Sequence, residues 1–526
     1  MKKNIFKISL FALLTLPALT ACDMDQLSPT NIGPNEATSS MEDAEAWRMG
    51  LYASLRGNYS AGAMYTSDVT LNEFALTTSD ANTNQPMSVW TFENATQDAP
   101  TSIYANNYSF IKNINKAIEK LPDVLNVEGL TRNDSLEVQQ ILGEAHLMRA
   151  MAYQTLTVFF TDRYDAAKAG QENTGLPVIA KVDEDELPVR QTLDSTYNFI
   201  LADLAAARSM MSNAVQAQLS PSYLHNPAIV SYLLPAEAAD IVEARVRLMR
   251  NKPATANAEA DAAIAARLAE GIISAGKYPL ATTAEELQDM WTNDRGSEII
   301  AQAYQSKDET GAEWSTFKGL NLNLTSQVGS DAFNPYMYPS NEALGLYENS
   351  DIRATANFLQ GWSYPAYLAT QSIRDAFVLL LNKFPGNPAL QQSRTDTYNM
   401  AKIFRSPEAY LLAAEAEYKL GNDSEALSYF NMLHHDARKA SELTNASDFE
   451  QQLANEYVRE FMGEGRAFEI YKRLKISFSR GARQQSGANT RLTITVNPDN
   501  RRWTWEFPQQ DLNANPNLVG NWNVGQ

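Results

Sequence analysis

The chain has 526 residues, of which 44% are hydrophobic, and 62 Asp and Glu against 43 Lys and Arg give it a net charge of −19. A chain of this size can bury a large core, either as one big domain or as two interlocked ones. The acidic balance argues against nucleic acid as a partner, because binding to a phosphate backbone requires a basic surface. A single cysteine excludes an internal disulfide bond.

The N-terminus has the pattern of a bacterial lipoprotein signal. Three lysines precede an apolar stretch, residues 8–19, that is too short to span a membrane. The following Leu-Thr-Ala-Cys sequence matches a lipobox, which predicts removal of residues 1–21 and lipidation of Cys22. Several acyl chains would anchor the protein stably, and the mature chain would have a net charge near −22 because three lysines are lost. The alternative is a cleavage site that ends at a cysteine by chance.

Helical periodicity predominates after a tether. Residues 22–40 are rich in Pro, Ser, Thr and Asn and predict a flexible, lipidated tether. From residue 41 onward, apolar residues recur at spacings of three and four, which predicts a mainly α-helical fold. Strand-like alternation is scarce, with residues 492–496 as the best case. Amphipathic helices are expected over residues 41–57, 102–121, 134–160, 192–213, 235–250, 257–275, 404–420, 423–440 and 447–475.

Several of these helices form pairs separated by short breaks. The clearest pair lies within residues 404–440, where small residues allow the two helices to approach closely and Gly421 separates them. Residues 235–250 with 257–275, and 136–160 with 192–213, are weaker candidates. Several such pairs in one chain predict an α-solenoid core. The spacing of the clearest pair is typical of a tetratricopeptide (TPR) repeat at Tyr410, Ala414, Gly421, Ala426 and Phe430.

Residues 304–367 have a different composition. Eleven of these 64 residues are aromatic, among Gly, Asn, Ser and Pro, which predicts a loop-rich insert, and long irregular inserts are usually functional. Aromatic rings can stack on the apolar faces of sugars, while Asn side chains bind hydroxyl groups. The alternative is that the rings pack the insert against the scaffold. We expect stacking from Trp90, Trp314, Tyr336 and Trp362, and hydrogen bonding from Asn321 and Asn334.

The sequence lacks the signature of a catalytic site. It contains no GxSxG, HExxH, Walker A or GxGxxG motif. His434 and His435 are adjacent on an expected helix and so point about 100° apart, which favours a surface or capping role over a metal site. Carboxylate pairs are too common in so acidic a chain to indicate glycoside hydrolysis. We expect no catalytic residue, no metal site and no cofactor, although the sequence leaves open whether Ca²⁺ assists.

The expected helix at residues 455–474 has apolar residues along one face and charged residues, expected to form ion pairs, elsewhere. It resembles the signature helix of the SusD/RagB family of Bacteroidetes outer-membrane lipoproteins. Glu469 stands where the family usually has Asp, and residues 457–459 match only in part. The matching residues are Glu460, Phe461, Glu464, Gly465, Arg466 and Arg473.

Further segments resemble other landmarks of this family in the same order along nearly the whole mature chain. On this resemblance, residues 41–295 are an N-terminal SusD-like helical region with TPR-like pairs. Residues 296–526 are the C-terminal SusD/RagB region, with ligand-binding loops at 304–367 and the TPR-like pair at 404–440. The similar segments are residues 143–150, 175–178, 200–204, 243–246, 275–280, 297–300 and 511–518.

The resemblance implies a lipoprotein, anchored in the outer membrane and facing the cell exterior, that captures a nutrient and delivers it to a SusC-like TonB-dependent transporter. Asp23 and Asp25, directly after the cysteine, resemble the surface-export signal of Bacteroidetes lipoproteins. Because the landmarks belong to the scaffold, they do not identify ligand contacts. The aromatic insert favours an oligosaccharide or polysaccharide ligand and a non-enzymatic role. The alternatives are a RagB-like peptide receptor, a TPR interaction scaffold without a small ligand, and a surface glycosidase.

Overall fold

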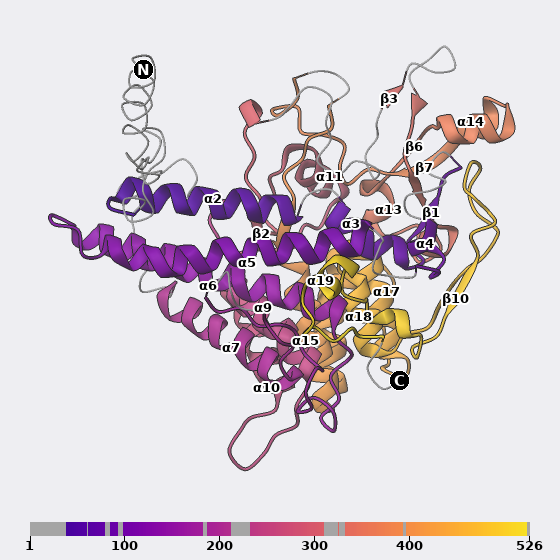
Figure 1. Cartoon of the computed structure of the whole chain (residues 1–526). Coiled ribbons are helices and arrows are strands. Elements are labelled where there is room, and N and C mark those ends of the chain that lie inside the picture. Colours follow the sequence, from indigo (N-terminus) through magenta and orange to yellow (C-terminus); the bar gives the residue numbers. More distant parts are fainter. Residues whose placement is uncertain are drawn as a thin grey trace, which may run out of the picture.

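The computed structural model describes residues 38–59, 62–78, 85–92, 98–181, 187–211, 232–309, 324–325, 332–392 and 396–522. Long helices form most of this part, and the strands are short (Figure 1). The helices are α2 (Met41–Tyr59), α3 (Gly62–Thr70), α4 (Gln85–Ser88), α5 (Asp98–Val124), α6 (Arg132–Phe160), α7 (Leu193–Met210), α9 (Ala236–Arg250), α10 (Asp261–Ala275), α11 (Ala284–Asn293), α12 (Asn341–Leu344), α13 (Ile352–Ala356), α14 (Tyr364–Thr370), α15 (Pro407–Leu420), α16 (Asp423–Asn431), α17 (Phe449–Phe461), α18 (Ala467–Leu474) and α19 (Gln509–Ala514).

The strands pair two by two. Each pair is antiparallel: β1 with β5, β2 with β8, β3 with β4, β6 with β7, and β9 with β10. The mainly α-helical fold with few short strands is therefore confirmed. The strands are β1 (Phe74–Leu76), β2 (Ile299–Gln302), β3 (Leu324–Thr325), β4 (Ala332–Phe333), β5 (Met337–Pro339), β6 (Phe358–Trp362), β7 (Phe377–Leu381), β8 (Lys402–Arg405), β9 (Phe478–Arg480) and β10 (Ile494–Val496).

The helices pack in a continuous series. Helices α2, α5 and α6 run side by side, and α6 packs on α7 (Figure 1). The series continues through α9, α10, α15 and α16, each of which packs on the one before it. Each of the three predicted pairs is a pair of packed helices. The start of α6 is fixed by a capping box, in which the Thr131 hydroxyl accepts from the Asp134 amide and the Asp134 carboxylate accepts from the Thr131 amide.

The predicted TPR-like pair is the α15–α16 hairpin. Ala414 and Ala426 are fully buried between the two helices, so their small size permits the close approach. Gly421 ends α15 in the left-handed conformation, with φ at 83°, which glycine adopts at little cost. The second helix continues as a π-helical turn over Met432–Ala437. Its His434 is buried and hydrogen-bonds to Glu456 at 2.8 Å, so the expected surface role for this histidine is wrong.

The expected continuous helix over residues 447–475 is instead two helices, α17 and α18. The chain breaks between them at Gly463 and Gly465, whose φ angles of 79° and 72° are left-handed and are disfavoured for other residues. The break allows the Gly465 amide to donate to the Asp68 carboxylate at 2.9 Å. It also places Glu464 against Arg405 at 2.7 Å and against Lys383.

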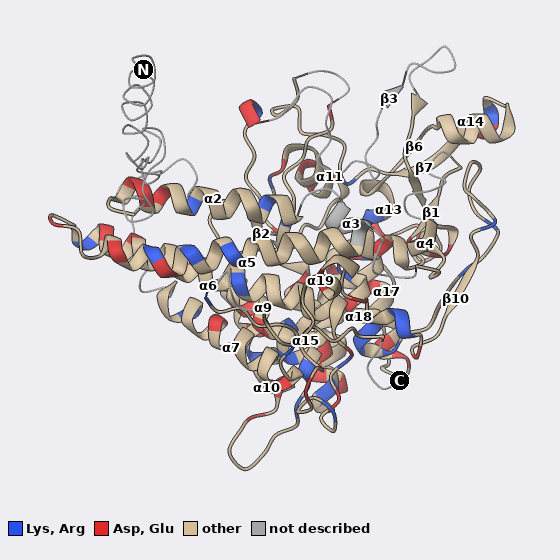
Figure 2. Ribbon diagram, in the orientation of Figure 1, with Lys and Arg blue, Asp and Glu red and all other residues tan. Residues whose placement is uncertain are grey.

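The charged residues of the signature segment form ion pairs, as predicted, and these pairs lie in the interior. Glu460 accepts from Arg405 at 2.7 Å, Arg438 at 2.9 Å and Arg353 at 3.1 Å. Burial raises the pKa of Glu460, but the positive charges of Arg438 and Arg405 outweigh it and hold the pKa well below its ordinary value. Figure 2 shows acidic and basic segments close together around α15, α17 and α18. These ion pairs join α17 to α13 and β8.

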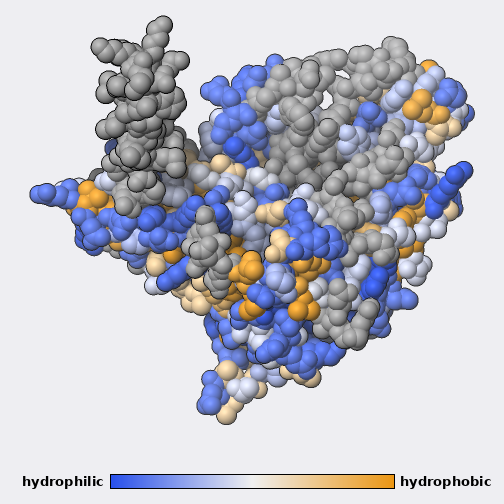
Figure 3. Space-filling model, viewed as in Figure 1, coloured by the Kyte–Doolittle hydropathy of each residue, from blue (hydrophilic) through white to orange (hydrophobic). Residues whose placement is uncertain are grey.

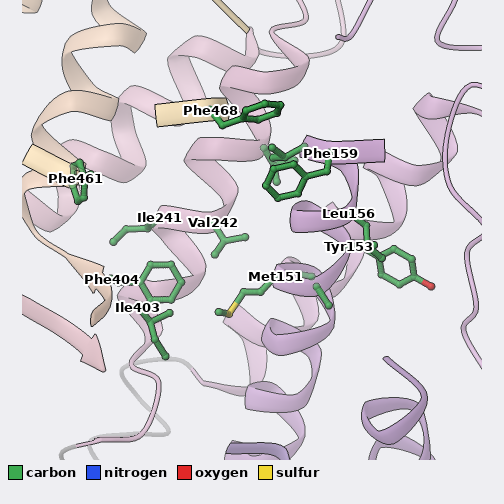
Figure 4. Packing of buried hydrophobic residues seen from close by; sticks show 14 of the residues in the cluster. Met151, Tyr153, Leu156, Phe159, Ile241, Val242, Ile403, Phe404, Phe461 and Phe468 are labelled. Carbon is green, nitrogen blue, oxygen red and sulfur yellow. The ribbon is translucent and has the colours of Figure 1, made fainter. Parts of the chain in front are cut away.

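One continuous hydrophobic core extends through both predicted regions of the chain. Figure 4 shows side chains of α6 and α9 facing side chains of β8, α17 and α18. Phe159 of α6 stacks on Trp505 with ring centroids 4.4 Å apart, and Phe468 of α18 lies 5.2 Å from Phe159. Residues from both ends of the chain therefore build the scaffold that carries the short strands.

Candidate functional site

The aromatic insert is not irregular where the structure describes it. Between residues 332 and 367 it contains β4, β5, α12, α13, β6 and the start of α14. Residues 310–323 and 326–331 lie outside the described part, and Trp314 and Asn321 lie there with them. The strands of the insert are held by segments on either side of it in sequence, because β5 pairs with β1 and β6 pairs with β7.

The β6–β7 hairpin has one covered face and one open face. In its register, Trp362 pairs with Phe377 and Gln360 pairs with Leu379. Because successive side chains of a strand alternate, Val378 points to the opposite face from Phe377. Val378 is 5% exposed and packs in a small core, whereas Phe377 is 42% exposed and Leu379 is 39% exposed. The covered face therefore holds the hairpin in place, whereas Phe377 and Leu379 on the other face are exposed among the described residues.

The open face presents two aromatic rings next to each other. Trp362 and Phe377 have ring centroids 4.5 Å apart and an interplanar angle of 58°. Gln360 is exposed beside them and provides an amide that can donate and accept hydrogen bonds. The surface formed by Trp362, Phe377, Gln360 and Leu379 is called the β6–β7 face below.

Helix α14 follows this face and is clamped by buried groups. The Ser363 hydroxyl caps the helix by accepting from the Ala366 amide, and it also hydrogen-bonds to the Tyr338 hydroxyl. Burial raises the pKa of Tyr338 to about 12, so this phenol stays protonated at neutral pH. Leu368 at the end of α14 is exposed, as is Ile373. Figure 3 shows hydrophobic side chains exposed at this corner of the molecule, over α14.

The structure brings only some of the predicted site residues together. Asn334 directly follows Phe333, whose ring packs against Gly361 of β6, so Asn334 lies close to the hairpin. Its side-chain oxygen is buried and has no hydrogen-bond partner among the described residues, which leaves a free acceptor. Tyr336 is half-buried and packs on the main core, whereas Trp362 packs on the small core that includes Tyr338.

Trp90 lies in the interior, with 3% of its surface exposed. Its indole N–H donates to the Thr70 carbonyl at 2.5 Å, and its ring lies 4.7 Å from Trp503 and 5.9 Å from Phe478. This position corrects the expectation for Trp90, because a ring covered in this way has no face on which a ligand could stack. The polar composition of the surrounding loop gave no sign of these distant partners.

Phe377 is a candidate site residue that the sequence did not indicate. It lies outside the aromatic insert, in the sequence Phe-Val-Leu-Leu-Leu, where all five residues are apolar. No alternation of polar and apolar residues therefore marked an open face. The pairing of this run with the strand that contains Trp362 is what places Phe377 beside that ring. This pairing is visible only in the structure.

The described residues contain neither a metal-binding cluster nor a helix that could span a membrane. No three His, Cys, Asp or Glu side chains in the described ranges lie close enough to hold a metal ion. In the same part of the chain, no helix combines the length and the apolar character needed to cross a bilayer.

Two family models match the chain. Residues 33–231 match a SusD-like model described as starch-binding and associating with the outer membrane. Residues 282–525 match the SusD family model. The chain belongs to the SusD/RagB family. The second match includes β6, β7 and the buried ion pairs around Glu460, so the signature that suggested this family lies within the scaffold.

Solved structures of SusD-like proteins share this fold. A SusD superfamily protein of Bacteroides thetaiotaomicron superposes with a TM-score of 0.72 and is 21% identical, over 92% of this chain and 99% of that one. Surface glycan-binding protein A from Bacteroides fluxus has a TM-score of 0.67 at 18% identity, over 93% and 100%. NanU of Bacteroides fragilis has a TM-score of 0.68 at 17% identity, over 94% and 99%. No curated protein matches the sequence.

Proposed function

We propose that this SusD/RagB protein is a non-enzymatic receptor that binds glycans through the β6–β7 face. The observation that carries the proposal is the position of Trp362 beside Phe377 on an open hairpin face, with Gln360 next to them. Flat rings offer stacking surfaces for the apolar faces of sugars, and the amide offers hydrogen bonds to hydroxyl groups. The description of the first family model as starch-binding supports this proposal, as do two structural neighbours named as surface glycan-binding proteins.

Asn334 and Tyr336 stay in the proposal as neighbours of this face. Asn334 provides the free acceptor described above. Trp314 and Asn321 lie outside the described residues and stay in the proposal as sequence predictions. Tyr336 would border the site from the side of the main core. Phe377 takes the stacking role that was expected of Trp90.

The N-terminal pattern adds location and partner to the proposal. Lipidated Cys22 would anchor the protein in the outer membrane, facing the cell exterior, next to a SusC-like TonB-dependent transporter. The tether at residues 22–40 would raise the effective concentration of receptor at the transporter. Replacing Cys22 with Ala should leave glycan binding by the purified protein intact and abolish its surface display and uptake. Normal display and uptake by this variant would contradict the anchoring role.

The stacking role can be tested with the double variant Trp362→Ala and Phe377→Ala. Loss of two stacking contacts, each of about 0.5–1.5 kcal/mol beyond area burial, should weaken the affinity for a neutral polysaccharide about tenfold or more. Isothermal titration calorimetry measures the affinity, and circular dichroism shows whether the variant is folded. Leu420→Ala removes an exposed apolar side chain elsewhere and serves as the control. A folded double variant with unchanged affinity would contradict the proposed site.

The structure disfavours one way of binding a peptide at this site. A peptide often joins the free edge of a sheet as an added strand. On β7, the Leu379 amide already donates to the Gln485 side chain at 2.8 Å, and the Leu379 carbonyl accepts from the same side chain at 3.1 Å. Binding of a peptide pool in place of glycans, or release of reducing sugar by the purified protein, would favour the peptide-receptor or glycosidase alternatives.

A further inference from the structure

A second surface of the molecule, at the end of the helical series, is hollowed into a cleft of about 820 Å³. It lies where α6, α9 and α18 end and meet residues 162–174 and 498–504. Pockets of this size are typical of ligand sites. None of the residues that line it belongs to the β6–β7 face, and Figure 1 shows α9 and α18 well separated from β6 and β7.

The charge of this cleft is opposite to that of the whole chain. Ten Lys or Arg and four Asp or Glu line it. In the complete sequence the acidic residues outnumber the basic ones, 62 to 43. Figure 2 shows basic segments on α18 and around the lower end of α15. A local excess of positive charge in so acidic a protein attracts anions to this cleft.

Ion pairs neutralise part of this positive charge and fix the walls. Arg250 at the end of α9 pairs with Asp261 at 2.7 Å. Lys252 pairs with Asp194 at 2.7 Å, which ties the loop after α9 to the start of α7. Arg473 of α18 pairs with Glu415 of α15 and with Glu469 of its own helix. Because these side chains are paired within the protein, they shape the cleft and are not the groups that we expect to bind a ligand.

Two buried cations of the lining donate hydrogen bonds only to backbone carbonyls among the described residues. Lys472 is 5% exposed, and its ammonium group donates to the carbonyls of Val158 at 2.6 Å and Thr161 at 2.7 Å. Arg190 is also 5% exposed and donates to two backbone carbonyls at 2.9 Å each. Burying a cation is costly, and burial lowers the pKa of Lys472 to about 7 although the negative charge of Asp162 opposes the shift. A bound anion would offset more of that cost.

Two more cations of the lining, Lys168 and Lys475, are exposed to solvent. Neither forms an ion pair with any residue that the structure describes. Lys475 follows α18 and Lys168 follows α6, so their charges come from different walls of the cleft. A single small anion could not contact cations on several walls of so large a cleft, whereas a chain of linked acidic groups could.

We propose that this cleft binds an acidic oligosaccharide that carries several carboxylate or sulfate groups. Arg190 supplies positive charge at the cleft wall, a bound acidic group would favour the protonated form of Lys472, and the exposed Lys168 and Lys475 bind further acidic groups. The paired residues Arg250 and Lys252 hold the walls. The proposal does not depend on glycan binding at the β6–β7 face, because the two surfaces share no residue.

The test uses three oligosaccharides of equal length with the purified protein: an oligogalacturonide, a heparin-derived oligosaccharide and a neutral malto-oligosaccharide. At least one acidic ligand should bind with an affinity that falls as salt is added, because exposed charges are screened. Carboxylates are the recognised groups if only the oligogalacturonide binds, and sulfates if only the heparin-derived ligand binds. The proposal fails if neither acidic ligand binds more tightly than the neutral one.

Variants then locate the binding. The double variant Lys168→Gln and Lys475→Gln should lower the affinity for the acidic ligand at least tenfold and leave the affinity for neutral polysaccharide unchanged. The control, Lys116→Gln with Lys181→Gln, makes the same charge change at exposed lysines that do not line the cleft. Equal weakening by the control would show a general charge effect and would overturn the proposal. The β6–β7 face variant should retain acidic binding, which separates failure here from failure of the proposed function.

Discussion

Glu408 is expected to contribute strongly to stability through buried ion pairs. It is 1% exposed at the start of α15 and pairs with Arg245 of α9 through two hydrogen bonds, of 2.6 and 2.5 Å. Arg466, in the segment before α18, donates to the same carboxylate at 3.0 Å. The change Glu408→Gln keeps the shape of the side chain and removes its charge. Two guanidinium groups would then face a neutral amide in the interior.

The size of the effect follows from the pKa of Glu408. Burial raises this pKa, but the charges of Arg245 and Arg466 outweigh it and lower the pKa from 4.5 to about 2. At about 1.4 kcal/mol per pKa unit, the difference corresponds to about 3 kcal/mol of stability at neutral pH. Breaking a buried ion pair from one side typically costs about 3–5 kcal/mol. Glu408→Gln should therefore lower the free energy of unfolding by about 3 kcal/mol.

Urea unfolding followed by tryptophan fluorescence measures this loss, because the chain has 8 Trp and the slope of the transition reports whether the denatured state has changed. Glu259→Gln is the matched control, since Glu259 pairs with Arg267 on the surface, where both side chains are largely exposed. The control should unfold at the same urea concentration as the original protein. If Glu408→Gln also does so, the buried pairs do not stabilise the fold as argued.

The remaining predictions concern pH and two glycines. The stability that Glu408 contributes is present above about pH 4.5 and lost as pH falls towards 2, so the difference between the original protein and Glu408→Gln should shrink over this range in urea unfolding. Gly421→Ala should cost only about 1 kcal/mol by the same measurement, because φ is 83° but no atom lies within 4 Å of the added Cβ. Gly487→Ala should lower the free energy of unfolding by more than this, because its Cβ would lie 2.5 Å from the Ala366 backbone in α14. It should also weaken the affinity for glycan in calorimetry. Unchanged affinity would show that α14 does not support the β6–β7 face.

Periodicity predicted most of the long helices because it reports local burial, but it did not predict α3 or α11. It was not sufficient to find the break between α17 and α18. Phe461 and Phe468 are seven residues apart and stay on one face of a hypothetical helix, so the apolar pattern runs on across the break. The break itself depends on Glu464 reaching Arg405, which lies on β8. Such a contact between distant parts of the chain leaves no local trace in the sequence.

The sequence indicated which types of residue form the candidate site, but not which individual residues. Aromatic density drew attention to Trp362, but it could not show that Phe377 lies opposite it across the hairpin. The role of Trp90 was set by Trp503 and Phe478, more distant in sequence still. Whether a ring is a platform or a core residue depends on which other segments cover it, and that information is not local.

The packing of α10 on α15 has a consequence for biogenesis. During synthesis, α9 and α10 emerge long before α15, so the apolar surface that α15 will cover stays open while the chain is made. The molecule therefore cannot complete its core one half at a time, and incomplete chains expose surfaces that favour aggregation.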